Sequence, residues 1–231
     1  MKGKILHYLF ASISMILKYI SNFLIFTTFI SGFAFSSNHQ VNSKKVSDII
    51  DPPESAALNI IVSSLSSLKE LRKQNQASLE NIEKLIRIKL LPNIDINYSS
   101  RISMGKYWEE LTDSEKKLVE TYIIESLIQD YVGILGTYKE LDSINITTGK
   151  NIVREDNLAR IPMIILYGNE KQSVNVEMGL IKTNSWKIYD VTYSGVSLIK
   201  NYQAQFASLA SRKGLEYLIN NITKRVLTIK K

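Results

Sequence analysis

Residues 186–206, WKIYDVTYSGVSLIKNYQAQF, constrain the fold more than any other stretch of the chain. Their first part is rich in aromatic and β-branched residues, which is typical of a β-strand. Ser194 and Gly195 interrupt it, and the chain resumes with Leu198 and Tyr202 at a spacing that predicts an amphipathic helix. A strand, a turn and a helix with large apolar groups on both arms either close a core or line a cavity.

Strands are expected before this corner. Residues 173–181 alternate between apolar and polar side chains, which predicts a half-buried antiparallel strand. Its apolar face carries Val174, Val176, Met178 and Leu180. A turn at 184–185 joins it to the strand that begins at Trp186, and further strands are expected at 142–147 and 159–167.

Helices are expected on both sides of the strands, because apolar residues there recur every three to four positions. The expected ranges are 54–71, 78–91, 95–104, 112–138, 198–210 and 215–227. Val62 belongs to the apolar stripe of the first range, and Thr112 with Glu115 forms a capping box that opens the fourth. The order of helices, strands and helices predicts an α+β class with an antiparallel sheet of about four strands.

Composition excludes several kinds of chemistry. The chain has no cysteine, and His7 and His39 are its only histidines, so thiolate, His-based metal and Ser–His–Asp sites have almost nothing to use. The net charge is +7, and without Lys2, Lys4 and Lys18 it falls to +4, which is too mild to indicate nucleic-acid binding. We expect no cofactor and no catalytic group.

Asp190 is the one acid that an enzyme hypothesis could use. It lies within the key strand, Glu177 lies on the polar face of the preceding strand, and no pair of acids is close enough in sequence to indicate a two-carboxylate site. A buried aspartate that accepts hydrogen bonds from the backbone or a tyrosine is the competing interpretation.

The N-terminus has the pattern of a targeting segment. Seventeen mostly apolar residues follow Lys18, and small residues at 34 and 36 suit a signal peptidase. We therefore expect a cleaved signal peptide at 1–36, a polar linker at 37–53 and a single domain at 54–231. A retained membrane anchor is the alternative, and a start at Met15 would give a shorter leader.

Several short motifs, in this order and spacing, resemble the MlaC family of periplasmic phospholipid-binding proteins, the toluene-tolerance auxiliary component of an ABC transport system. They comprise Leu90, Leu91, Pro92, Asp95, Tyr98, Gly105, Trp108, Leu111, Thr112, Tyr131, Tyr138, Trp186, Tyr189, Asp190, Val191, Gly195, Val196, Ser197, Phe206 and Gly214. The chain departs from the family in its longer leader and in Gln203, where an arginine is often found.

The resemblance implies a curved antiparallel sheet packed against helices, with an apolar pocket between them. It implies a soluble periplasmic carrier that moves phospholipid and maintains outer-membrane lipid asymmetry. Its partners would be an outer-membrane lipoprotein–porin complex and an inner-membrane ABC transporter with a substrate-binding ring protein. A carrier of hopanoid-like lipid, an enzyme on a similar fold using Asp190, and a membrane-anchored interaction protein are the alternatives.

The apolar faces on the strands and helices supply the expected lipid-binding residues. They are Leu127, Tyr131, Leu135, Val174, Val176, Met178, Leu180, Tyr189, Val191, Tyr193, Val196 and Ile199. Each of these side chains is either part of a pocket wall or part of a filled core, and the sequence leaves both open.

Overall fold

The computed structural model describes residues 52–137, 141–150, 152–168 and 172–229, which belong to one compact unit. Helices and an open antiparallel sheet make up this unit, so the expected α+β class is confirmed. The expected signal peptide, nearly all of the linker, both histidines and Tyr138 lie outside the described residues. Within the described ranges, no helix is both long enough and apolar enough to cross a membrane.

The sheet has six strands in the order β1–β3–β4–β5–β6, and β2 pairs with β3 beside β1. The strands are β1 (Asn145–Thr148), β2 (Val153–Glu155), β3 (Leu158–Tyr167), β4 (Gln172–Lys182), β5 (Trp186–Tyr193) and β6 (Val196–Ser197). Sequence reasoning expected about four strands and missed β2 and β6, because three and two residues are too short to show a period.

Pro162 explains why the strand beside β3 is broken into β1 and β2. Proline has no N–H to give to a neighbouring strand, and it faces the gap between Thr148, which pairs with Met163, and Val153, which pairs with Arg160. The Gly149 N–H donates to the Pro162 carbonyl across this gap at 2.7 Å.

Two local features shape β5 and the chain that follows it. Gly179 pairs with Asp190 but Leu180 pairs with Ile188, so Tyr189 is the extra residue of a β-bulge. The expected turn at Ser194 and Gly195 is confirmed: both have positive φ, 49° and 78°, as a tight hairpin turn requires.

The helices match the expected ranges closely. They are α2 (Pro53–Lys73), α3 (Leu79–Leu85), α4 (Ile96–Met104), α5 (Asp113–Thr137), α6 (Leu198–Lys213) and α7 (Leu215–Ile229). After α3 the chain continues as a π-helical turn (Ile86–Leu90) and a 3₁₀ turn (Leu91–Asn93), and 3₁₀ turns also occur at Gly105–Glu110 and Leu141–Ser143. The capping box of α5 is formed, with the Thr112 N–H donating to Glu115 Oε2 at 2.8 Å and the Glu115 N–H donating to Thr112 Oγ1 at 3.3 Å.

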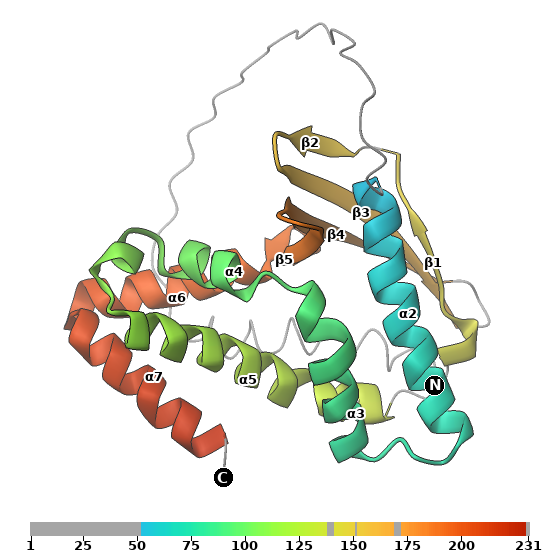
Figure 1. Cartoon of the computed structure of the whole chain (residues 1–231), viewed down its shortest axis with the longest axis horizontal. Coiled ribbons are helices and arrows are strands. Elements are labelled where there is room, and N and C mark those ends of the chain that lie inside the picture. The colour runs from blue at the N-terminus through green and yellow to red at the C-terminus, as the bar shows by residue number, and fades with distance from the viewer. Residues whose placement is uncertain (1–51, 138–140, 151, 169–171, 230–231) are drawn as a thin grey trace, which may run out of the picture. The chain divides into compact units, whose positions relative to one another are not determined.

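Two apolar layers hold the unit together. One is a helical core between α4, α5, α6 and α7, which includes Trp108, Ile123, Tyr202, Phe206 and Leu218. In the other layer α2 lies across the sheet and contacts β1, β3, β4 and β5. Figure 1 shows α2 over the strands, with α4, α5, α6 and α7 gathered beside them.

The buried face of α2 differs from the expected stripe. Ala57, Ile60 and Leu68 are buried, whereas Val62 is 45% exposed. Three apolar residues follow one another at 60–62, so spacing alone did not decide which of them faces inward, and the choice of Val62 was wrong.

Candidate lipid-binding site

One face of the sheet is apolar across its three long strands. On β4 the residues of this face are buried: Val174, Val176, Met178 and Leu180 are exposed by 9, 8, 3 and 0%. Their partners on β3 are Ile165, Met163, Ile161 and Ala159. Directly paired residues of antiparallel strands point to the same face, so these side chains form a continuous apolar surface.

Strand β5 extends this surface. Tyr193 pairs with Val176, and Val191 pairs with Met178, so both side chains lie on the same face. Val191 and Tyr193 are half-buried. Six of the twelve lipid-binding residues predicted from the sequence therefore lie together, on β4 and β5.

Tyr189 lies on the opposite face of the sheet, because of the bulge. Gly179 faces the side of β4 opposite to Met178 and Leu180. A Cβ built on Gly179 would lie 2.8 Å from Tyr189 Cζ, so the Tyr189 ring is on that opposite side. The ring packs edge-on against Tyr98 of α4, with 5.2 Å between centroids. The sequence placed Tyr189 with Val191 and Tyr193, and regular alternation cannot reveal a bulge between them.

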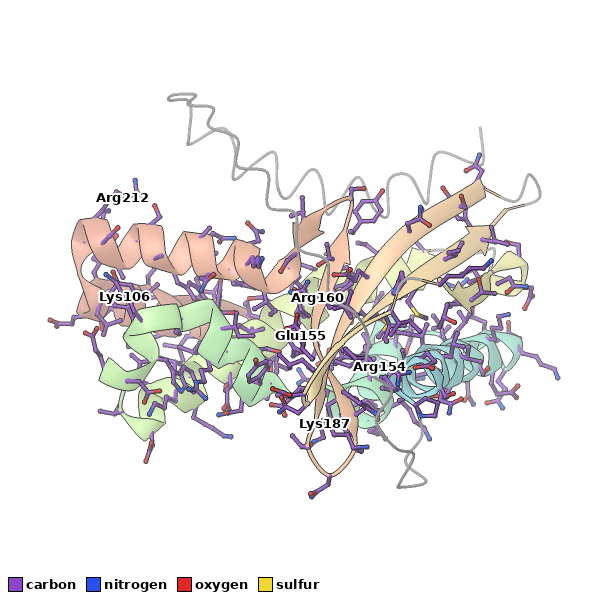
Figure 2. All side chains as sticks on the ribbon, turned by 90° about the horizontal axis from the view of Figure 1, so that it is seen from above. Lys106, Arg154, Glu155, Arg160, Lys187 and Arg212 are labelled. Carbon is purple, nitrogen blue, oxygen red and sulfur yellow. The ribbon has the colours of Figure 1, made fainter. Side chains whose placement is uncertain are left out.

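A small cavity opens on that opposite face. Its volume is about 60 Å³, and it is lined by Val153, Glu155, Leu158, Ala159, Arg160 and Tyr189. Figure 2 shows Glu155 and Arg160 close together at this end of the sheet. Ligand pockets usually measure about 300–1,000 Å³, so this cavity is too small for the acyl chains of a phospholipid.

The remaining predicted residues lie on the helices and at the sheet edge. Leu127 is packed against the helical core, and Ile199 is buried inside it. Val196, on the short edge strand β6, is 40% exposed. Tyr131 and Leu135 are half-buried in the C-terminal half of α5.

The C-terminal end of α5 contacts both α2 and α3. Arg72, at the end of α2, donates from Nη2 to the Leu135 carbonyl at 2.6 Å. Leu79 of α3 is so close to Gly136 that a Cβ there would lie 2.8 Å from Leu79 Cδ2. Burial raises the pKa of Tyr131 to about 12, with a smaller contribution from Asp130, so its hydroxyl is neutral in an apolar environment.

Sequence reasoning missed the sheet-facing residues of α2 and β3. Ala57 and Ile60 come from α2, and Ile161 and Met163 come from β3, whereas the buried Leu68 of α2 was predicted by helical spacing. The alternation of Ile161, Met163 and Ile165 was visible in the sequence, but the register with β4 is needed to show that they share a face with Val176.

Asp190 is fully engaged in holding the corner after β5. Its carboxylate accepts hydrogen bonds from the Ser197 hydroxyl at 2.6 Å and from the N–H groups of Val191 and Ile199 at 2.8 and 3.1 Å. These contacts match the interpretation of Asp190 as a buried, hydrogen-bonded aspartate. In the described part of the chain, no group of three or more His, Cys, Asp or Glu residues is arranged to hold a metal ion.

Comparison with known proteins agrees with this architecture. The chain is 22% identical over 141 residues to the intermembrane phospholipid transport system binding protein MlaC of Haemophilus influenzae, and the match covers 60% of the chain and 65% of that relative. It resembles the solved structure of a phospholipid-binding protein from Ralstonia solanacearum in complex with a phospholipid, with a TM-score of 0.66 and 21% identity. That match covers 78% of this chain and 99% of the other.

The sequence profile of the family described as MlaC protein matches residues 59–224, which is most of the chain and nearly all of the described unit. The chain therefore belongs to the MlaC family.

Proposed function

We propose that this chain is a carrier for a phospholipid, whose acyl chains lie against the apolar face of β3, β4 and β5. The observation that supports this most is the continuity of that face. Ile161, Met163, Val176 and Met178 are all buried, and none of the residues that pair directly with them on this face is ionic. The solved relative of this fold is a phospholipid complex, and a second relative is named for phospholipid transport, which supports the same cargo.

The physical chemistry of lipid transfer explains what such a site must do. Two acyl chains carry about 28 methylene groups, and at about 0.8 kcal/mol each their exposure to water costs roughly 20 kcal/mol. A carrier that offers an apolar wall of matching extent makes transfer between membrane and protein nearly neutral in free energy. Lipid of that size needs a site of roughly 800 Å³, within the usual range for ligand pockets.

We propose that the acyl chains enter between α2 and the sheet, bordered by Tyr131 and Leu135 of α5. α2 covers the apolar face as a single helix, and polar contacts hold its two ends. Glu54 at the first turn pairs with Arg154 of β2 at 2.7 Å, and Arg72 at the last turn donates to the end of α5. A single covering helix can move away from a sheet with fewer lost contacts than a strand within it.

We further propose that residues 1–36 are a cleaved signal peptide and that the carrier works in the periplasm. Membership of the MlaC family and the apolar segment that ends in small residues support this. By the same family membership, its partners would be an outer-membrane lipoprotein–porin complex and an inner-membrane ABC transporter with its substrate-binding ring protein.

Lipid uptake tests the cargo. The purified chain, stripped of lipid with detergent and returned to buffer, is incubated with phosphatidylethanolamine–phosphatidylglycerol vesicles, separated from them, and assayed for lipid phosphorus. We expect about one phospholipid per chain. Phosphorus at the level of an unrelated soluble protein, from a chain whose circular dichroism is unchanged, would contradict the proposal. Uptake of a hopanoid instead, in a parallel incubation, would keep the carrier and change its cargo.

A further inference from the structure

Positive charge is concentrated in the C-terminal part of the sequence, and five of its basic residues lie on α6 and α7. Residues 200–231 contain seven lysines and arginines and one acid, Glu216, whereas residues 37–199 contain 19 basic and 21 acidic residues. The C-terminal segment thus has a net charge of +6 on a body of net charge −2. A local excess of positive charge attracts a negatively charged partner to one part of the protein, which evenly spread charges would not do.

The inner side of α7 is already used by the core. Leu218, Ile219, Ile222 and Val226 are 2 to 8% exposed and pack in the helical core with α5 and α6. The opposite side is exposed along the whole helix, at Tyr217, Asn220, Lys224 and Leu227. Their spacing of three, four and three residues places them in one row along the helix axis.

This row combines cations with large apolar side chains. Tyr217 is 43% exposed and Leu227 is 61% exposed. Lys213, at the end of α6, places its ammonium group 4.6 Å from the centre of the Tyr217 ring. We call Lys213, Tyr217, Asn220, Lys224 and Leu227 the α7 face. Figure 1 shows α7 on the outside of the helical group, and Figure 2 shows Arg212 at the end of α6 away from the sheet.

The cations of the α7 face form no ion pair with the described residues, although Lys213 Nζ donates to the Tyr217 hydroxyl at 3.3 Å. Among the described residues, the ion pairs involve Lys69, Lys84, Arg87, Lys117, Arg154 and Arg160. Neither Lys213 nor Lys224 takes part in any of them. Arg225, next to Lys224 on the helix, donates a long hydrogen bond of 3.5 Å to the Tyr122 hydroxyl.

We propose that the α7 face docks on the surface of a bilayer that contains anionic phospholipid. The apolar side of α7 is buried in the core, so the contact is made by its exposed side, where lysines can bind anionic head groups and Tyr217 and Leu227 can enter the interface between them. Tyrosine is favoured at that depth because its ring is apolar and its hydroxyl is polar.

The contact is expected to be weak and reversible. Only two large apolar side chains protrude, so binding depends mainly on charge and weakens as salt is added. A protein that docks, exchanges and leaves requires an attachment of this strength. The proposal goes beyond the cargo proposed above, since it concerns the outer surface of α7 and holds whether or not the sheet face binds lipid.

Sedimentation with vesicles tests it, with the amount of protein in the pellet as the readout. We expect the purified full chain to pellet with phosphatidylcholine vesicles containing phosphatidylglycerol at low salt, and not with pure phosphatidylcholine. Each lysine near an anionic surface contributes roughly fivefold to binding, so Lys213→Gln with Lys224→Gln should weaken it about 25-fold. Leu227→Gln should weaken it several-fold.

The matched control removes two exposed lysines elsewhere, Lys89→Gln with Lys150→Gln, and should change binding less than twofold because these sites are outside the α7 face. An equal loss in the control pair would show that net charge, and not this face, is responsible, and would overturn the proposal. Absence of wild-type binding to the anionic vesicles would overturn it too and leave an acidic protein as the partner. Because lipid phosphorus per chain is measured separately, the docking and cargo proposals can fail independently.

Discussion

The Ser197 hydroxyl donates a 2.6 Å hydrogen bond to the buried carboxylate of Asp190 while accepting one from the Lys200 N–H at 3.0 Å. Ser197 is the N-cap of α6, so this hydroxyl connects the end of β5 to the first turn of the helix. The strand–turn–helix corner visible in the sequence is held at this point.

Removal of that hydroxyl should destabilise the whole unit. Ser197→Ala loses the cap and leaves a buried carboxylate short of one donor, so we expect the free energy of unfolding to fall by about 1–3 kcal/mol. Urea unfolding monitored by circular dichroism measures it. Ser211→Ala, which removes an exposed hydroxyl from the end of the same helix, should change stability by less than about 0.5 kcal/mol. Equal effects of the two changes would disprove the role given to Ser197.

The bulge in β5 makes a second prediction. Gly179→Ala places a methyl group 2.8 Å from the Tyr189 ring carbon Cζ, so the ring must shift. We expect the free energy of unfolding to fall by about 1–3 kcal/mol. Gly133→Ala is the matched control, since nothing lies within 4 Å of its Cβ on α5, and it should stabilise the helix by about 0.5–1 kcal/mol. Thermal unfolding compares the two, and a neutral Gly179→Ala would show that Tyr189 does not occupy that space.

Local features of the fold could be predicted from the sequence, whereas features that depend on a neighbouring strand could not. The capping box at Thr112 and the turn at Ser194 were predictable, because each depends on residues within a few positions of one another. The bulge at Tyr189 was not, because a strand with an extra residue has the same composition as one without. The break between β1 and β2 opposite Pro162 could not be predicted either. The proline is visible in the sequence, but the sequence does not show which strand lies beside it.

The residues of the candidate site also fall into those that the sequence could predict and those that it could not. Val174, Val176, Met178 and Leu180 were predicted from strict alternation along one strand, and they do share one face. Their neighbours on α2 and β3 depend on which segments meet in space. Helical spacing across 54–71 predicted the buried Leu68 but admitted more than one inward face, and packing in the folded chain selected Ala57 and Ile60 instead of Val62.

Tyr131 gives the fold a dependence on high pH. Its pKa is about 12 in the folded chain against about 10 for an unperturbed tyrosine, so below pH 10 it is neutral in both states. Above pH 10 the unfolded chain loses this proton first, so stability falls as the pH rises toward 12. We expect wild type to lose about 2–3 kcal/mol more than Tyr131→Phe across that interval. Urea unfolding at pH 9 and near pH 12 measures the difference.

An equal loss in the two proteins would mean that Tyr131 titrates normally and that its environment is not apolar. Tyr217→Phe controls for the removal of a hydroxyl from an exposed tyrosine.

Two tryptophan substitutions on one strand separate the site from the rest of β4. Val176→Trp places a bulky indole on the apolar face beneath α2. The indole occupies space that the acyl chains need, so we expect the amount of bound lipid to fall to about half or less. Asn175→Trp adds the same side chain on the exposed face of the same strand and should leave lipid content unchanged. The readout is lipid phosphorus per folded chain. Loss in both variants, or in neither, would remove the β4 face from the proposed site.

The most direct test of the central claim is mass spectrometry of the lipid that accompanies the protein purified from its own cell envelope. The account predicts about one diacyl phospholipid per chain, released by organic solvent and retained through chromatography. A well-folded protein that carries no lipid would contradict it, and would show that the buried face of β3, β4 and β5 is only packed core.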